Sequence, residues 1–456
     1  MPPTSSFQPD VSAEDLHRAQ DRLNVRNARA GKGLRSHLWL LFLLIGPGIL
    51  VMIGENDGPS MLSYAATGAV YGIGFFVPFI ILTFAMAFVV QELTVRLAAV
   101  THRGHAELIF DRFGPFWGWF SMIDLAIGNF LTLVVEFIAI QAGLGYFGVP
   151  APIAVGAGLL LAIGVMLSRR YWTWERIALF ISIGNCLFVP VAFLVHPDWA
   201  AVGHSIITWG PLPAGGINQN LVLYMMSNIG ATVTPWMLFF QQSALKDKGL
   251  TPKDIGHSRI DTLIGATLAA AFGVAALVAT SVLFAHNVNT SNFSSGPFAA
   301  AQFAQALEPF AGKFGATLFA LAIIEAGTLA VITISGSSAY AFGEVTGAAH
   351  SLNRPLNEAP GFYIVMIVGA ALAGALVLIP NAPLTLIVLV VNVIATLAMP
   401  PALIFLILLV NDRKVMGEYV NGRLANLFAI AVTVFLVLAG IIWGTVTILT
   451  GLGVMH

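Results

Sequence analysis

Eleven stretches of about twenty predominantly apolar residues recur along this chain of 456 residues. A helix of that length spans the roughly 30 Å hydrocarbon core of a bilayer. Charged residues make up only 9% of the chain and hydrophobic residues 57%, whereas soluble domains are roughly 25% charged. We therefore expect an all-α integral membrane protein with about 11 transmembrane helices, at residues 38–70, 74–98, 117–145, 151–168, 174–196, 219–243, 262–286, 315–342, 361–380, 383–410 and 425–450.

The connections between these stretches are short, which predicts one integral domain. Residues 1–36 are the exception, because they are polar, mixed in charge and open with MPPTSSFQPD, a composition typical of a solvated, disordered tail. That charged tail precedes the first span without a cleavage site, so we expect no signal peptide. The single cysteine, Cys186, excludes an internal disulfide and is expected to be a small core residue.

Basic residues indicate how the chain is oriented. If the spans alternate in direction, the Lys and Arg residues of the tail and loops fall on one side of the membrane, with Lys313 on the other. The positive-inside rule then predicts a cytoplasmic N-terminus and, with eleven spans, an extracytoplasmic C-terminus. We expect this arrangement in the inner membrane of a bacterial cell, with the bilayer as the main partner and neither a nucleic acid nor an obligate protein partner.

Two spans contain signals for a helix break. Span one contains GENDGPS and span six contains NIGATVTPW, and in each a Gly and a Pro flank small polar residues. These spans begin on opposite sides of the membrane, so residues 37–196 and 219–410 can form two inverted repeats of five helices, with 425–450 as an eleventh helix. Corresponding broken helices in inverted halves indicate a transporter with its binding site near the membrane midplane. Unwound backbone at that depth is tolerated where it lines a cavity or binds an ion.

Asp57 indicates which kind of ligand the first break can bind. An unpaired carboxylate near the bilayer centre costs about 2.5–3.5 kcal/mol, and a bound cation is the simplest counter-charge. Asn56, Ser60, Thr232 and Thr234 would add oxygen ligands beside the free backbone carbonyls of the two breaks. A coordination sphere made of oxygen favours hard cations such as Mg²⁺, Ca²⁺ and Mn²⁺.

Other carboxylates in the spans have two interpretations. Glu136 and Glu325 each stand alone within an apolar stretch, and the sequence leaves open whether they are functional or form packing hydrogen bonds. Asp124, Glu175 and Glu344 lie near span ends, where a packing role explains them better.

The histidines offer no metal-ligand spacing. His102, His105, His257 and His350 fall in predicted cytoplasmic loops, and we expect them to be solvated. A membrane-embedded metalloenzyme would need clustered ligands such as HExxH, which the sequence does not contain. We therefore expect no catalytic residues and no cofactor, and we treat a bound metal as a transported substrate.

Four segments, in order from Gly46 to Arg423, match a known pattern: GPGILVMIGENDGPS followed by GAVYG, QELTVRLAAVTHRGHAELI, NIGATVTP, and NDRKVMGEYVN. They resemble the Nramp divalent-metal transporters, whose first span has GPG followed by DPGN and whose later segments read GATVMPH and DRRLMGEFAN. The resemblance implies the LeuT-type fold, in which helices 1 and 6 are broken, with a metal site between them.

The resemblance also implies roles for individual residues. Asp57 matches the family's metal-binding aspartate, and Ala231 matches an alanine whose carbonyl coordinates the metal. Ser60 stands where the family has an asparagine ligand, although Asn56 lies close by. Asn392 matches a glutamine of span ten that approaches the ion.

Beside Ser60, three further features depart from the family pattern. Thr234 replaces a methionine, and Trp236 replaces a histidine that the family associates with proton movement. Glu136 matches the glutamate of a third-span DLAE motif, but the stretch reads TLVVE and lacks the aspartate. The metal-site residues that we predict are Asp57, Ala231, Thr234, Asn56, Ser60, Asn392 and Glu136.

These departures predict a changed substrate. A thioether helps to hold Mn²⁺, Fe²⁺ or Cd²⁺ and discriminates against alkaline-earth ions, so its loss predicts that Mg²⁺ is accepted. This pattern resembles the Nramp-related magnesium transporter branch. With the residues linked to proton transfer gone, we expect a uniporter that imports Mg²⁺ and Mn²⁺ by alternating access. A proton-coupled importer of Mn²⁺ and other transition metals, of the ordinary Nramp type, and an amino-acid transporter of the same fold remain alternatives.

Overall fold

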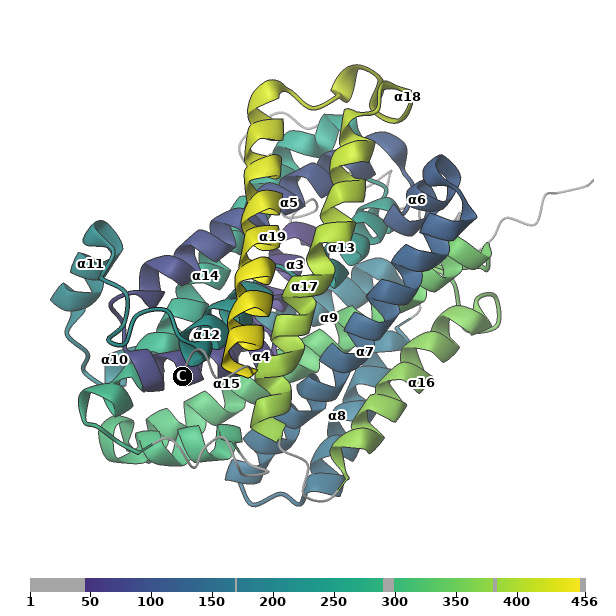
Figure 1. The fold of residues 1–456 in the computed structure, drawn as a ribbon. Helices are drawn as coiled ribbons and strands as arrows, with labels where there is room; N and C mark the ends of the chain where they lie inside the picture. Colours follow the sequence, from purple (N-terminus) through teal and green to yellow (C-terminus); the bar gives the residue numbers. More distant parts are fainter. Residues whose placement is uncertain (1–45, 169, 290–298, 380–383, 452–456) are drawn as a thin grey trace, which may run out of the picture.

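The computed structural model describes residues 46–168, 170–289, 299–379 and 384–451, so the predicted tail, residues 1–36, lies outside it. Within these ranges every regular element is helical (Figure 1). The elements are α3 (Pro47–Gly54), α4 (Gly58–Tyr71), α5 (Phe76–Thr101), α6 (His105–Phe113), α7 (Pro115–Tyr146), α8 (Ala151–Met166), α9 (Tyr171–Ser182), η1 (Ile183–Leu187), α10 (Phe188–Leu194), α11 (Trp199–Thr208), α12 (Gln219–Gly230), α13 (Pro235–Lys248), η2 (Pro252–Asp254), α14 (Ile255–Ala285), α15 (Ala299–Thr346), α16 (Pro360–Val377), α17 (Leu384–Asn411), α18 (Arg413–Met416), η4 (Gly417–Tyr419) and α19 (Arg423–Gly451).

The helices confirm the predicted membrane fold. In the described part of the chain, nine helical stretches are long and apolar enough to cross a membrane. The apolar helix α8 is shorter, with 16 residues, and α3 and α4 form one interrupted span. Together they account for the eleven predicted stretches. Figure 1 shows α17 and α19 side by side along the bundle, and α11, which the sequence analysis did not predict, beside its edge.

Each break is made by the local sequence. The helix α3 ends at Gly54, and α4 restarts with Pro59 in its first turn and Asp57 as the N-cap. In the second repeat α12 ends at Gly230 and α13 restarts at Pro235. Proline suits the first turn of a helix because its missing N–H would lack a partner there in any case. The two Gly and Pro signals therefore correctly predicted both breaks.

Glycine brings the broken helices close to their neighbours. A Cβ at Gly68 would lie 2.1 Å from the carbonyl oxygen of Leu277 on α14, and one at Gly230 would lie 1.8 Å from the carbonyl oxygen of Asn392 on α17. Membrane helices pack through such small residues because apolar burial alone gives little drive in lipid. The two glycines thus fix how α4 and α12 sit against the rest of the bundle.

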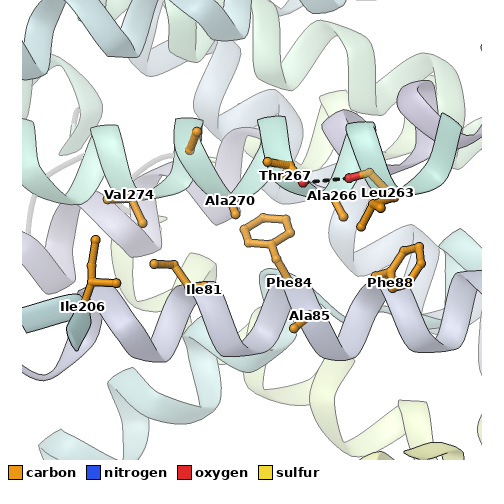
Figure 2. A pocket seen from close by; sticks show the side chains of 11 residues that line it. Ile81, Phe84, Ala85, Phe88, Ile206, Leu263, Ala266, Thr267, Ala270 and Val274 are labelled. Carbon is orange, nitrogen blue, oxygen red and sulfur yellow. Dashed lines mark hydrogen bonds between the residues drawn. The ribbon is translucent and has the colours of Figure 1, made fainter. Parts of the chain in front are cut away.

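An apolar groove of about 460 Å³ lies along the junction of α5 and α14, and its lining side chains include Phe84, Phe88 and Val274 (Figure 2). The hydroxyl of Thr267 in its wall donates to the carbonyl of Leu263 at 2.9 Å. That hydroxyl is therefore satisfied within α14. The groove presents hydrocarbon along two membrane-spanning helices.

Two expectations about single residues are wrong. His105 is fully buried at the start of α6, with Nδ1 3.0 Å from Oε1 of Gln242 and its ring edge-on to Phe239. Cys186 is exposed on η1 instead of lying in the core. Sequence position alone gave no sign that α6 folds back against α13.

Acidification is expected to destabilise the fold through His105. Burial lowers the pKa of His105 to about 4 from an ordinary value near 6.5. Between these values the unfolded chain binds more protons, so stability falls as the pH is lowered through that range. From pH 7 to pH 5 this residue should remove about 2 kcal/mol from the free energy of unfolding. Denaturant unfolding in detergent, compared with His105→Gln, measures it, and equal acid sensitivity in the two proteins would contradict the assignment.

Candidate metal site

Hydrogen bonds join the two helix breaks. Thr234 Oγ1 donates to the carboxylate of Glu55, at 2.7 Å from Oε1 and 3.0 Å from Oε2. The hydroxyl of Tyr64 on α4 donates to the carbonyl of Ala231 at 3.0 Å. Segments far apart in the sequence therefore meet at the centre of the bundle, where the sequence analysis placed the site.

Asp57 lies at the first turn of α4 and is 2% exposed. Its Oδ1 accepts the backbone N–H of Ser60 at 2.9 Å, and its carboxyl group lies near enough to Glu136 of α7 to interact with it electrostatically. Glu136 Oε2 accepts the N–H of Gly58 at 3.0 Å, and its Oε1 is buried without a partner among the described residues. The positive end of the α4 dipole faces both groups and favours negative charge here.

Glu55, Asp57 and Glu136 are thus buried near one another, and none of them has a basic partner among the described residues. The ion pairs found in the described part of the chain involve other acidic residues, and Glu55, Asp57 and Glu136 are in none of them. A buried carboxylate is costly unless it is paired. The site is therefore suited to a positively charged ligand, which would offset that cost.

The remaining predicted residues surround these carboxyl groups. Asn56 Nδ2 donates to the carbonyl of Ala269 on α14 at 2.8 Å, and its Oδ1 lacks a partner in the described structure. Asn392 Nδ2 lies 3.4 Å from the carbonyl of Pro59, so α17 reaches the start of α4. All seven predicted residues are buried around the two breaks. Their role as metal ligands stays a prediction.

Thr232, at the second break, makes its hydrogen bonds with the preceding residues of α12. Its hydroxyl donates to the carbonyls of Asn228 and Ile229, at 3.2 and 3.0 Å. These bonds run back along α12, as is common for a threonine at a helix end. Thr232 therefore donates its hydroxyl proton within its own break, and a role of its oxygen as a ligand stays a prediction.

Two residues of the site were missed. Glu55 is the first carboxylate of ENDGPS, and its place in the same break as Asp57 was the signal that could have identified it. Tyr64 follows Asp57 by seven residues, two helical turns, so the spacing places both on one face of α4. That spacing was the signal that could have identified Tyr64.

The donor set is made of oxygen. Carboxylates, hydroxyls, amide oxygens and the Ala231 carbonyl line the two breaks. In the described residues no three His, Cys, Asp or Glu side chains are grouped so that they could hold a metal ion by themselves. An ion here would divide its coordination among few side chains, backbone carbonyls and water, as hard cations accept.

The fold and the site define an integral membrane protein of the LeuT type with an acidic centre at its two helix breaks. The family model "Natural resistance-associated macrophage protein-like" (Nramp) matches residues 48–445. The chain therefore belongs to the Nramp family.

Named relatives and solved structures agree with this assignment. The chain is 26% identical over 414 residues to "Divalent metal cation transporter MntH" of Aeromonas hydrophila, covering 87% of this chain and 95% of the relative. It is 27% identical to the MntH of Ralstonia nicotianae, covering 86% and 88%. The structure of the Eremococcus coleocola manganese transporter aligns with a TM-score of 0.73 at 19% identity, covering 90% and 88%. A Na⁺-coupled sialic acid symporter aligns with a TM-score of 0.55 at 13% identity, covering 95% of this chain and 92% of the symporter.

Proposed function

We propose that this protein imports the divalent cations Mg²⁺ and Mn²⁺ by alternating access and without proton coupling. The observation that carries the proposal is the meeting of the two breaks, where Glu55, Asp57 and Glu136 gather beside the Thr234 hydroxyl and the Ala231 carbonyl. Relatives that align over most of the chain are named divalent metal cation transporters, which supports a divalent metal as the substrate.

Thr234 supports the acceptance of Mg²⁺. A hydroxyl occupies the position where the family has a thioether, and it is fixed by its bonds to Glu55. Mg²⁺ dehydrates reluctantly and is usually held by one or two carboxylates while it keeps several waters. Carboxylates and a hydroxyl meet that requirement without the sulfur that would select softer metals.

Trp236 supports transport without protons. It is buried in the first turn of α13, and its ring lies 3.3 Å from where a Cβ of Gly54 would be, at the end of α3. An indole N–H donates a hydrogen bond but does not accept a proton at neutral pH. The position that carries a histidine in the family therefore holds a packing group beside the site.

A proton-coupled importer has one observation in its favour. The carboxyl groups of Asp57 and Glu136 are both buried and interact electrostatically, and two neighbouring carboxyl groups tend to retain a proton unless a cation compensates their charge. Whether such a proton is transported with the metal decides between the two functions.

The proposal includes an arrangement in the membrane. Residues 37–196 and 219–410 form the inverted repeats, and residues 425–450 form an additional helix. The N-terminus faces the cytoplasm across the inner membrane of a bacterium. The inward-negative potential then drives uptake with about 2.3 kcal/mol per charge for each 100 mV, which doubles for a divalent ion.

A paired flux assay tests the proposal. Proteoliposomes containing the full chain receive a Mg²⁺ or Mn²⁺ gradient with the membrane potential clamped, and trapped dyes report the metal and the internal pH. We expect saturable metal uptake, competition between the two ions and no acidification. Acidification in proportion to metal entry would establish the coupled alternative, and absence of metal uptake above that of empty liposomes would refute metal transport.

Replacing Thr234 with methionine is expected to favour soft metals. The change removes both hydrogen bonds to Glu55 and adds a thioether, so the preference for Mn²⁺ or Cd²⁺ over Mg²⁺ should rise about tenfold, or about 1.4 kcal/mol. Thr234→Val is the matched control, because it loses the hydroxyl without gaining sulfur. Identical competition curves for the Met and Val variants would show that the sulfur has no role in selectivity.

A further inference from the structure

Glu325 lies on α15 at about the same depth in the bundle as the candidate metal site, but on the side of α15 that faces away from α7. Two residues further along, a Cβ at Gly327 would lie 2.9 Å from the backbone oxygen of Glu136, so this face of α15 contacts α7 at the site. Residues two apart on a helix point in nearly opposite directions. The Glu325 side chain accordingly faces η1, the 3₁₀ segment between α9 and α10.

The segment η1 is shaped around this side chain. A Cβ at Gly184 would lie 2.4 Å from Cγ of Glu325, so the absence of a side chain there makes room for the glutamate. The next residue, Asn185, is 0% exposed, and its Nδ2 donates to Glu325 Oε2 at 2.8 Å. Gly184 therefore leaves space for the carboxyl group and the Asn185 amide binds it, so η1 forms a defined binding site for Glu325.

Two oxygens of this pair are left without partners. Glu325 Oε1 and Asn185 Oδ1 are both buried and have no hydrogen-bond partner in the described structure. Both are acceptors while the carboxyl group is ionised. Glu325 is in none of the ion pairs of the described residues, so an ionised form would place a carboxylate with a buried, unpartnered oxygen within a membrane-spanning helix.

We propose that Glu325 and Asn185 form a proton-binding site, in which Glu325 carries a proton on Oε1 and donates it to Asn185 Oδ1. One proton then neutralises the carboxyl group and satisfies both oxygens, and the acid and the amide are joined by two parallel hydrogen bonds. A metal ion at this place would have two side-chain oxygens, whereas hard cations take about six or more. The proposal does not depend on which metal the protein transports.

The neighbouring titratable groups leave this proton in place. Cys186 on η1 interacts electrostatically with Glu325, and a thiol is uncharged at neutral pH. Glu175 and Arg176 of α9 lie about two and a half turns before Asn185, and Glu175 is paired with Lys248 at 2.9 Å. Glu136 lies on the opposite face of α15. Loss of the proton under alkaline conditions would weaken the contact between η1 and α15, so this contact is sensitive to pH.

Infrared difference spectroscopy on the full chain in nanodiscs tests for the proton directly. Glu325→Gln reproduces the shape and hydrogen bonds of the protonated form, because its amide can donate to Asn185 Oδ1 and accept from Nδ2. The spectrum of the wild type minus that of Glu325→Gln should show the carbonyl band of a protonated carboxylic acid, shifted in D₂O. Asn185→Ala should move this band to the frequency of a less strongly bonded acid. Absence of the band at neutral pH would overturn the proposal.

Thermal unfolding across pH gives an independent readout. The melting temperatures of the wild type and Glu325→Gln should agree at mildly acidic pH, and the wild type should fall below the variant as the pH rises. Glu325→Ala, which leaves Asn185 unpaired, should have a lower melting temperature than Glu325→Gln at every pH. Parallel curves for the wild type and Glu325→Gln, or stabilisation of the wild type alone by Na⁺, would overturn the assignment, the latter in favour of a metal ion. Metal uptake by Glu325→Gln is measured alongside, so that a failure of the proposed transport function is recognised separately.

Discussion

Replacing Asp57 with alanine is expected to reduce divalent metal uptake at least about a hundredfold, because removing one partner of a buried charge pair costs about 3–5 kcal/mol. Asp57 is buried at the N-terminus of α4, where the backbone N–H of Ser60 fixes one carboxylate oxygen and Glu136 interacts electrostatically with the group. Proteoliposome uptake of Mg²⁺ and Mn²⁺, together with metal binding by calorimetry, measures the loss. The loss should appear in both, since the carboxylate is proposed to touch the ion.

Asp124→Asn is the matched control for this experiment. Asp124 is a partly buried carboxylate on α7, the helix that also carries Glu136. Asp124 precedes Glu136 by twelve residues, which is more than three helical turns. Its replacement removes a carboxylate from the same helix without touching either break, so uptake should remain close to that of the wild type. Uptake by Asp57→Ala at the level of Asp124→Asn would show that the ion does not depend on Asp57.

The two carboxylates of the first break have different partners. Asp57 is held within its own break, by the first turn of α4, whereas Glu55 receives the hydroxyl of Thr234 from the other break. Glu55 and Tyr64 therefore connect the two repeats, one on each side of Asp57 in the sequence. A change in the distance between the breaks would alter these two contacts before it altered the cap at Asp57.

The breaks could be predicted from the sequence because their causes are local. Glycine and proline favour a break where they flank small polar residues within a span, and carboxylates in an apolar stretch require a compensating partner. Both signals can be read without knowledge of the neighbours. The same holds for the eleven apolar stretches, whose length follows from the thickness of the bilayer.

The direction of each side chain at the breaks could not be predicted. Asn56 lies between two carboxylates in the sequence, yet its amide turns to the Ala269 carbonyl on α14. His105 follows a polar loop, yet it packs against Phe239 because α6 folds back on α13. These directions depend on backbone angles and on neighbours more than a hundred residues away, which local pattern does not encode.

Asp261 on α14 is expected to hold α3 in place, and Asp261→Ala should release it. Its Oδ1 accepts the N–H of Gly46 at 3.1 Å and its Oδ2 accepts the N–H of Gly48 at 2.7 Å, so one buried carboxylate satisfies two donors at the start of α3. Hydrogen bonds to a charged group contribute about 1.5–3 kcal/mol each, so losing both should shift the ratio of closed to open α3 by about a hundredfold or more.

Thiol labelling of the Thr333→Cys variant measures the release of α3. Thr333 is fully buried, and its hydroxyl lies 3.9 Å from where a Cβ of Gly54 would be, so α3 covers it. In a Cys186→Ser background, Thr333→Cys should react with a membrane-impermeant thiol reagent much faster when Asp261 is alanine. Asp198→Ala, which removes the carboxylate that caps α11, is the control and should leave the rate unchanged. Equal labelling of Thr333→Cys with Asp261 intact and with Asp261→Ala would mean that α3 is held by its packing against α14 and not by Asp261.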